Sequence, residues 1–283
     1  RKESALPWLE SIKSVFEILS DNTFSQVKTW VIKEGHPVID YGQTFYAITH
    51  TLRLVEYAYL LGDTTDAYLL MRRIFESVLQ YLFFHVIRKK TRSENLEIND
   101  EYIDKMFDSY LFDKNYETDK SKMDYWATNT PLDDKQRKQR RNSITIQNYI
   151  HSLNREVPIL EKCITSFFPK TISPLMIKMD DYAHGNALNS YRQEIKPHEM
   201  IENDALDLTI IILSYISLID ASLLRSNDYV GSLEFGEIPI EGSQAWIASV
   251  FSDFFDAYMD PKYPGLRKFL NNNNSAGMEI SSL

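Results

Sequence analysis

Cysteine is almost absent from this 283-residue chain, which contains only Cys163. A single cysteine cannot form an intramolecular disulfide, so the composition favours a reducing compartment, and we expect a cytoplasmic protein. Cys163 lies in the apolar segment LEKCITSFF. We expect a buried, inert thiol there, because reactive thiols need an accessible and electropositive setting.

The short motifs that mark metal and nucleotide sites are missing as well. The six histidines form no HExxH or Glu-x-x-His pattern, and no second cysteine is available for a Cys/His zinc site. The chain has no GxxxxGK[ST] or GxGxxG phosphate loop and no GxSxG elbow. We therefore expect no metal site, no cofactor and no acyl transfer on an α/β scaffold.

Cationic residues are outnumbered, with 31 Lys and Arg against 40 Asp and Glu and a formal net charge of −9. This balance argues against duplex-DNA binding, which usually needs a basic face. The exception is the run KQRKQRR at 135–141, whose cations are Lys135, Arg137, Lys138, Arg140 and Arg141. The favoured interpretation is a solvated helix face, and the alternative is a patch for RNA phosphates or for an acidic partner protein.

Uninterrupted apolar runs of membrane-spanning length are also lacking. The longest apolar segment, LTIIILSYISLIDASLL at 208–224, carries Asp220 and three serines. It predicts a buried helix rather than a membrane span, and we expect no membrane association.

What the chain does contain is helical periodicity, since apolar residues recur mostly at intervals of three and four. Gly62 is expected to end one helix and Asp63 to cap the next. The breakers in 34–42 predict a turn, and 228–242, with three glycines and a proline, predicts a loop or short hairpin. The expected helices lie near 5–20, 24–33, 43–61, 64–90, 99–112, 131–153, 156–167, 172–183, 198–225, 242–259 and 264–271. The sequence thus predicts an all-α bundle of long antiparallel helices with shorter peripheral helices, in a single domain over 1–283.

The helix expected at 64–90 has an unusually wide apolar side, which predicts a central position in the bundle. Arg72 and Glu76 lie four residues apart at the margin of that side, where they can pair. The favoured interpretation is a partly buried pair that fixes helix register. The alternative is that the pair orients a third group on a facing helix. Arg73 is expected to point toward solvent.

The octapeptide MDDYAHGN at 179–186 gathers several groups that can carry chemistry. If the helix continues this far, Asp180 and His184 share one face, where the carboxylate would fix the imidazole for general acid–base work. Gly185 and Asn186 would then end the helix. The same facts permit a second interpretation, in which His184 only caps the helix end.

The Arg-x-x-x-Glu on MRRIFESVLQYL, followed later by Tyr-Ala-His-Gly-Asn before an apolar helix, resembles the HEPN (higher eukaryotes and prokaryotes nucleotide-binding) superfamily. The resemblance covers roughly 43–225, leaving 226–283 as a C-terminal helical extension with a loose tail. It implies a four- or five-helix core, homodimerisation, and a link to RNA cleavage or prokaryotic defence.

In active members of that superfamily an Arg lies four to six residues before a His. The His falls on His184, whereas Lys178 occupies the Arg position, and Lys offers a point charge in place of a planar fork. For a metal-independent ribonuclease, the resemblance implies His184 as general acid–base and Lys178 and Arg72 on the phosphate. Asp180 or Glu76 would orient these groups, and Asn186 would help to bind.

Two other functions stay open on the sequence. In the first, the chain is a non-catalytic module for protein interaction or dimerisation, with the Arg72–Glu76 pair and the His184 turn serving structure. In the second, a pocket among the abundant aromatic residues senses a small molecule.

Overall fold

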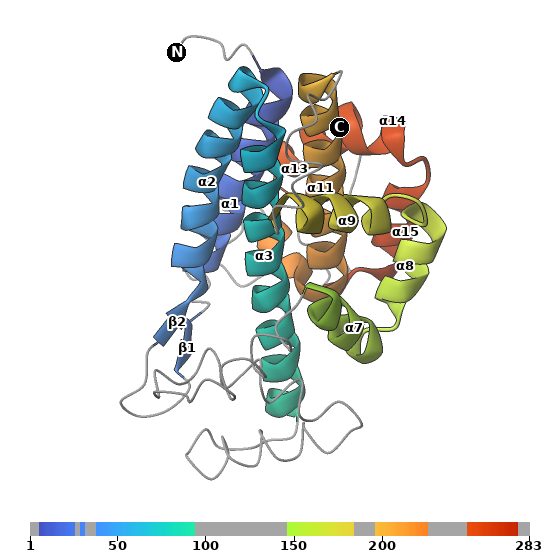
Figure 1. Ribbon diagram of the computed structural model, residues 1–283. Coiled ribbons are helices and arrows are strands. Elements are labelled where there is room, and N and C mark those ends of the chain that lie inside the picture. The colour runs from blue at the N-terminus through green and yellow to red at the C-terminus, as the bar shows by residue number, and fades with distance from the viewer. Residues whose placement is uncertain are drawn as a thin grey trace, which may run out of the picture. The chain divides into compact units, whose positions relative to one another are not determined.

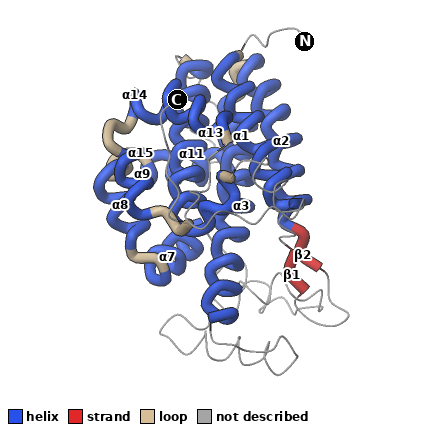
Figure 2. The backbone as a smooth tube through the Cα atoms, turned by 180° about the vertical axis from the view of Figure 1, so that it is seen from behind, coloured by secondary structure: helices blue, strands red, loops and turns tan. Residues whose placement is uncertain are grey.

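Helices make up nearly all regular structure in the part of the chain that the computed structural model describes, namely residues 6–25, 29–31, 38–93, 146–183, 196–225 and 248–276 (Figures 1 and 2). They are α1 (Pro7–Ser25), α2 (Tyr41–Leu61), α3 (Thr64–Ser93), α7 (Ile146–Glu156), α8 (Ile159–Phe167), α9 (Ile172–Ala183), α11 (Pro197–Asp220), the 3₁₀ turn η1 (Ala221–Leu224), α13 (Ser249–Phe254), the π-helical turn η2 (Phe255–Met259), α14 (Asp260–Lys262) and α15 (Leu266–Asn273). Two three-residue strands, β1 (Thr29–Val31) and β2 (Val38–Asp40), pair antiparallel. The expectation of an all-α protein is confirmed.

The chain forms two compact units. The first contains Arg1–Lys28, Tyr41–Val78 and Ile159–Leu283, and the second contains Thr29–Asp40 and Leu79–Pro158. Helix α3 therefore contributes its first half to one unit and its second half to the other. A compact unit is not by itself a domain, so the single-domain expectation stays a prediction.

Helix α11 forms the centre of the first unit. Every residue from Leu208 to Asp220 is buried, and the helix contacts α1, α2, α8 and α15. A helix that is apolar on all sides must be covered on all sides, which confirms the expectation of a buried helix at 208–224. By length and composition Pro197–Leu224 could also cross a bilayer, with a mean hydropathy of 1.8 in its most apolar window. However, 83% of that window is buried inside the protein, and the core helix of a globular protein passes the same test.

The junction between α2 and α3 follows the predicted chemistry. Gly62 ends α2 with a φ of +68°, a conformation that glycine adopts without strain. The Asp63 carboxylate accepts a hydrogen bond from the Asp66 backbone N–H at 3.1 Å and so caps α3. Both expectations are confirmed, and the sharp turn lets α2 and α3 run beside each other.

The expected helix at 24–33 is wrong. Helix α1 continues to Ser25, and Thr29–Val31 forms β1, with Trp30 opposite Ile39 of β2. The physical reason is that β-branched and aromatic residues flank a segment containing Gly35 and Pro37, a pattern that favours paired strands over a helix.

The turn predicted over 34–42 does not extend to Gly42. This residue lies in the first turn of α2, where an added Cβ would come within 2.5 Å of the Phe24 ring, so it permits close approach of α1 and α2. The expectations for 99–112 and 228–242, and for residues 131–145 of the helix expected at 131–153, fall outside the described residues.

The second unit contains the amphipathic helix α7. Ile146, Tyr149 and Leu153 are buried at the spacing of one helix face. The Tyr149 ring meets the Phe83 ring of α3 edge to face at a centroid distance of 5.6 Å. This aromatic contact anchors α7 to the second half of α3 within that unit.

Candidate functional site

Helix α9, which carries two of the predicted site residues, has the bounds expected from the sequence, residues 172–183. It begins near Pro174, a residue tolerated in the first turn of a helix. One side of α9 is buried through Ile172, Leu175, Met176, Met179 and Tyr182. Lys178 and Asp180 flank that buried side, which places their charged ends between α9 and its neighbours.

Asp180 meets Arg72 of α3. Arg72 Nη1 lies 2.5 Å from Asp180 Oδ1, and the Arg72 side chain is 18% exposed against 40% for Asp180. Within the described residues, this carboxylate, and not Glu76 of the same helix, is the ion-pair partner of Arg72. The expected Arg72–Glu76 pair is thus corrected, because α9 brings a closer carboxylate to the guanidinium.

Glu76 nevertheless belongs to the same cluster. Burial raises the pKa of the Glu76 carboxyl, the charge of Arg72 opposes that rise, and the charge of Asp180 adds to it. Glu76 is therefore close enough to both partners to feel their charge. Burial therefore makes the charged form of this carboxyl less favourable than it would be in water.

Lys178 makes a second ion pair, with Asp204 of α11. Lys178 Nζ lies 2.6 Å from Asp204 Oδ2, and the Tyr68 hydroxyl of α3 donates to the same oxygen. The ammonium also lies 5.9 Å from the centre of the Tyr68 ring, within cation–π range. The Tyr68 ring stacks on Tyr182 of α9 at 4.8 Å and 4°. Asp204 thus ties α3, α9 and α11 together through one carboxylate oxygen.

We call the seven side chains gathered here the α3–α9 cluster: Tyr68, Arg72, Glu76, Lys178, Asp180, Tyr182 and Asp204. Its two cations face three carboxyl groups, so the cluster is electrically balanced or slightly negative. The more exposed edge is formed by Lys178 and Asp180, whose side chains are 37% and 40% exposed. An anion approaching this edge would meet both cations only by displacing carboxylates from them.

Sequence reasoning missed Tyr68, Tyr182 and Asp204. Asp204 does carry a signal, because it falls between Ile201 and Leu208 on the buried stripe of α11. A carboxylate on a buried stripe needs a partner. Nothing in the sequence identifies that partner as Lys178 or Tyr68.

The remaining predicted site residues lie outside the described residues. These are His184, Asn186, and the basic run Lys135, Arg137, Lys138, Arg140 and Arg141. In the sequence, His184 directly follows Ala183, the last residue of α9. The roles suggested for these residues stay predictions.

Cys163 lies in the core, as expected. It is buried in α8, and burial raises the pKa of its thiol to about 12. At neutral pH the thiol is therefore protonated and a poor nucleophile. Among the described residues, no three His, Cys, Asp or Glu side chains are grouped as a metal site would require.

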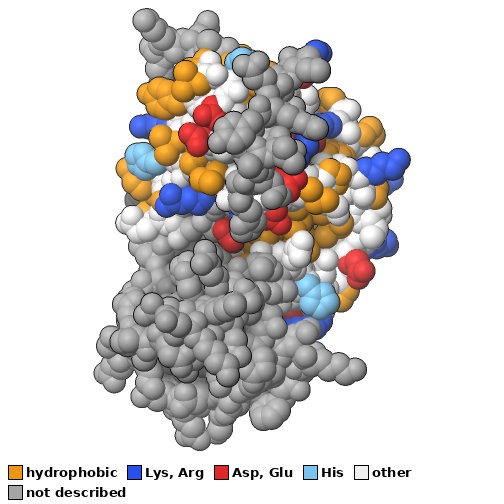
Figure 3. Space-filling view, viewed as in Figure 1, with side chains coloured by type: hydrophobic (Ala, Val, Ile, Leu, Met, Phe, Trp, Pro, Cys, Tyr) orange, Lys and Arg blue, Asp and Glu red, His pale blue; other side chains and the backbone are white. Residues whose placement is uncertain are grey.

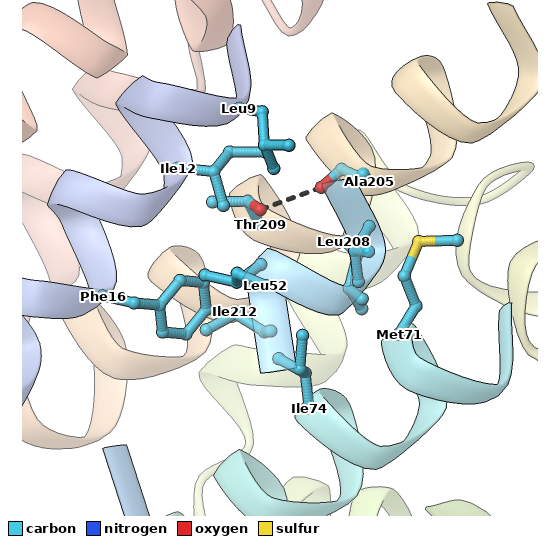
Figure 4. A pocket seen from close by; sticks show the side chains of 11 residues that line it. Leu9, Ile12, Phe16, Leu52, Met71, Ile74, Ala205, Leu208, Thr209 and Ile212 are labelled. Atoms are coloured by element: carbon cyan, nitrogen blue, oxygen red, sulfur yellow. Dashed lines mark hydrogen bonds between the residues drawn. The ribbon is translucent and has the colours of Figure 1, made fainter. Parts of the chain in front are cut away.

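A cavity also lies in the first unit, between α1, α2, α3 and α11 (Figure 4). Its volume is about 10 Å³, and its lining is apolar apart from Thr209, whose hydroxyl donates to the Ala205 carbonyl at 2.8 Å. A space of this size holds about one water molecule and offers no free polar anchor. It is a packing defect rather than a ligand pocket.

No family model, curated protein or solved structure matches this chain. The case for a site therefore depends on the side chains themselves.

Proposed function

We propose that the protein is a HEPN-like helical module that acts on RNA, with the α3–α9 cluster and His184 as its working residues and prokaryotic defence as its setting. The observation that supports this is the 2.5 Å contact between Arg72 and Asp180. It joins two motifs that lie 108 residues apart in the chain, the Arg-x-x-x-Glu of α3 and the segment leading to His184.

The α3–α9 cluster also contains an arginine that can take the place of the one missing from the motif before His184. Lys178 occupies the motif position on α9, but Arg72 of α3 reaches the same helix and supplies the planar guanidinium that Lys178 lacks. A guanidinium and an ammonium on neighbouring helices can together neutralise the charge that builds up on a phosphate.

In the proposed reaction, His184 takes the proton from a ribose 2′-hydroxyl, and the 2′-oxygen attacks the adjacent phosphorus. The bond to the 5′-oxygen breaks, His184 returns the proton to that oxygen, and a 2′,3′-cyclic phosphate remains. Asp180, four residues before His184, would orient the imidazole once phosphate displaces it from Arg72. The basic run at 135–141 would hold RNA outside the reacting centre.

The test compares two lysines in closely matched ion pairs. Lys178 pairs with Asp204, and their side chains are 37% and 15% exposed. Lys262 pairs with Asp207 at 2.5 Å, and their side chains are 31% and 13% exposed. In an RNA-cleavage assay with chelator present, Lys178→Ala should lower the rate at least about 100-fold, as for loss of a group that stabilises transition-state charge. Lys262→Ala should retain the wild-type rate. Equal rates for the two variants would remove Lys178 from the reaction.

A second candidate function is a non-catalytic interaction module. It is favoured by the observation that Arg72 and Lys178 both already pair with carboxylates, which is what a structural cluster would show. On this alternative, purified protein cleaves no RNA, and neutralising the cations of 135–141 abolishes capture of an acidic partner protein.

A further inference from the structure

Helix α11 ends earlier than its sequence predicts. The expected helix continues to residue 225, whereas α11 ends at Asp220 and η1 follows it as a 3₁₀ turn over Ala221–Leu224. The four residues of η1 are Ala, Ser, Leu and Leu, which include the strongest helix formers, and residues 217–225 contain neither glycine nor proline. The break lies at Asp220, whose φ of −140° and ψ of 64° are not helical. Local sequence therefore does not explain where α11 ends.

Contact with solvent does not explain the break either. Asp220 and Ala221 are only 4% and 1% exposed. Helix α11 lies among the other helices of the first unit in Figures 1 and 2, and Figure 3, drawn from the same side as Figure 1, shows side chains of other elements over it. Backbone groups that are freed at a buried helix end need partners from the protein itself.

Ser275, two residues after the end of α15, supplies those partners. In an unbroken α-helix the Ala221 N–H would donate to the Ser217 carbonyl, four residues before it. Instead, the Ala221 N–H donates to the Ser275 hydroxyl at 2.8 Å, and the Ser275 N–H donates to the Ser217 carbonyl at 3.0 Å. One residue thus takes both halves of the hydrogen bond that would continue the helix. Insertion of this kind is a recognised cause of a break in a helix.

We call residues 274–276 the α15 strap. Asn274 fixes its conformation, because the side-chain amide donates to the carbonyls of Leu270 and Asn271 and the side-chain oxygen accepts from the Ala276 N–H, each at 3.2 Å. Leu270 is buried, so α15 anchors one end of the strap in the core. Ser275 itself is exposed. The contact between the strap and α11 can therefore open without unfolding the core.

We propose that the α15 strap is a conformational switch for the end of α11. While Ser275 is inserted, α11 ends at Asp220. When the strap withdraws, the Ala221 N–H bonds to the Ser217 carbonyl and the helix continues through η1. The two states are closely matched in hydrogen bonds, because the groups that Ser275 releases become partners of each other. The proposal is drawn from α11, η1 and α15 alone and stands whether or not the protein cleaves RNA.

Continuation of α11 would change the contacts of η1. The Asn22 side-chain amide of α1 donates to the carbonyls of Leu223 and Arg225 at 2.6 and 2.9 Å. The Ala248 N–H, just before α13, donates to the Leu224 carbonyl at 3.0 Å. In an α-helical turn these carbonyls point along the helix axis toward residues four positions later, so they would leave Asn22 and Ala248. Insertion of Ser275 is thus coupled to α1 and α13.

Nuclear magnetic resonance of the full chain tests the switch at Asp220, whose ¹³Cα shift reports its backbone conformation and should be non-helical in the wild type. Ser275→Ala removes only the hydroxyl and should move this shift into the helical range. In the same variant, hydrogen exchange of the Asn22 side-chain amide should accelerate at least about 10-fold. Ser275→Thr keeps the hydroxyl and should resemble the wild type. So should the matched control Ser249→Ala, at an exposed serine of α13.

A non-helical Asp220 in Ser275→Ala would overturn the proposal, because the break would then not depend on the strap. A helical Asp220 with unchanged exchange at Asn22 would overturn the coupling to α1.

Relaxation dispersion of the wild type measures the switching itself. Asp220 should exchange on the microsecond-to-millisecond timescale with a minor state whose ¹³Cα shift equals that of Ser275→Ala. The absence of dispersion at Asp220 would make Ser275 a static cap and overturn the switch.

Discussion

Removing the Asp204 carboxylate should destabilise the protein, because one of its oxygens holds groups from two other helices. Tyr68 is fully buried and donates its hydroxyl to Asp204 Oδ2, and Lys178 lies 2.6 Å from the same atom. A hydrogen bond to a charged group contributes about 1.5–3 kcal/mol. The Lys178 side chain is more than one-third exposed, so solvent screening reduces its share to below about 1 kcal/mol.

Asp204→Ala should therefore lower the free energy of unfolding by about 3 kcal/mol, mostly through the Tyr68 hydrogen bond. Asp204→Asn keeps an acceptor oxygen and should cost about 1–2 kcal/mol. Urea denaturation followed by circular dichroism measures both. The control is Asp253→Asn, at an exposed carboxylate of α13, which should stay within about 0.5 kcal/mol of wild type.

A double-mutant cycle isolates the contact. Tyr68→Phe should cost about 1.5 kcal/mol in the wild type and close to nothing in Asp204→Ala, because its acceptor is already gone. Additive effects of the two substitutions would refute the shared oxygen, and so would an Asp204→Ala variant as stable as the Asp253→Asn control.

Two further predictions concern the same unit. Burial raises the pKa of Glu76 above its ordinary value of 4.5, so the folded protein holds this proton to higher pH than the unfolded chain, and stability falls as pH rises through that interval. The free energy of unfolding of Glu76→Gln should accordingly rise relative to that of the wild type as the pH is raised from 4 to 7. The same difference in unfolding free energy between the two proteins at both pH values would contradict this. Leu208→Ala should cost about 3 kcal/mol in urea denaturation, since it enlarges the cavity between α1, α2, α3 and α11, and a cost below about 1 kcal/mol would show that the core collapses around the site.

The helices could be predicted from the sequence where apolar periodicity and end signals agree. Helix α9 has the expected bounds, and the α2–α3 junction follows from Gly62 and Asp63. Prediction failed at 24–33, where short apolar segments fit either a helix or a strand and the pairing of Trp30 with Ile39 decides. Local sequence does not contain that pairing, since it forms between separate segments.

The candidate site could be predicted only in part. Charged residues on one helix can be placed on a common face by counting, which correctly located Arg72 at the margin of the apolar side of α3. The partner of Arg72 depends on which helix packs beside α3. Because α9 brings Asp180 to the guanidinium, Arg72 pairs with Asp180 and not with Glu76. Asp204 was missed for the same reason, because its role arises from the packing of α11 against α3 and α9.

The most direct test of the proposed function is RNA cleavage by purified protein in the presence of chelator, with His184→Ala beside the wild type. His198→Ala serves as the matched control, since His198 is an exposed histidine of α11 whose ring contacts the Tyr59 ring of α2. We expect the wild type and His198→Ala to cleave RNA to 2′,3′-cyclic phosphate ends and His184→Ala to lose that activity. Cleavage by His184→Ala at the wild-type rate, or no cleavage by any of the three proteins, would contradict the proposed ribonuclease.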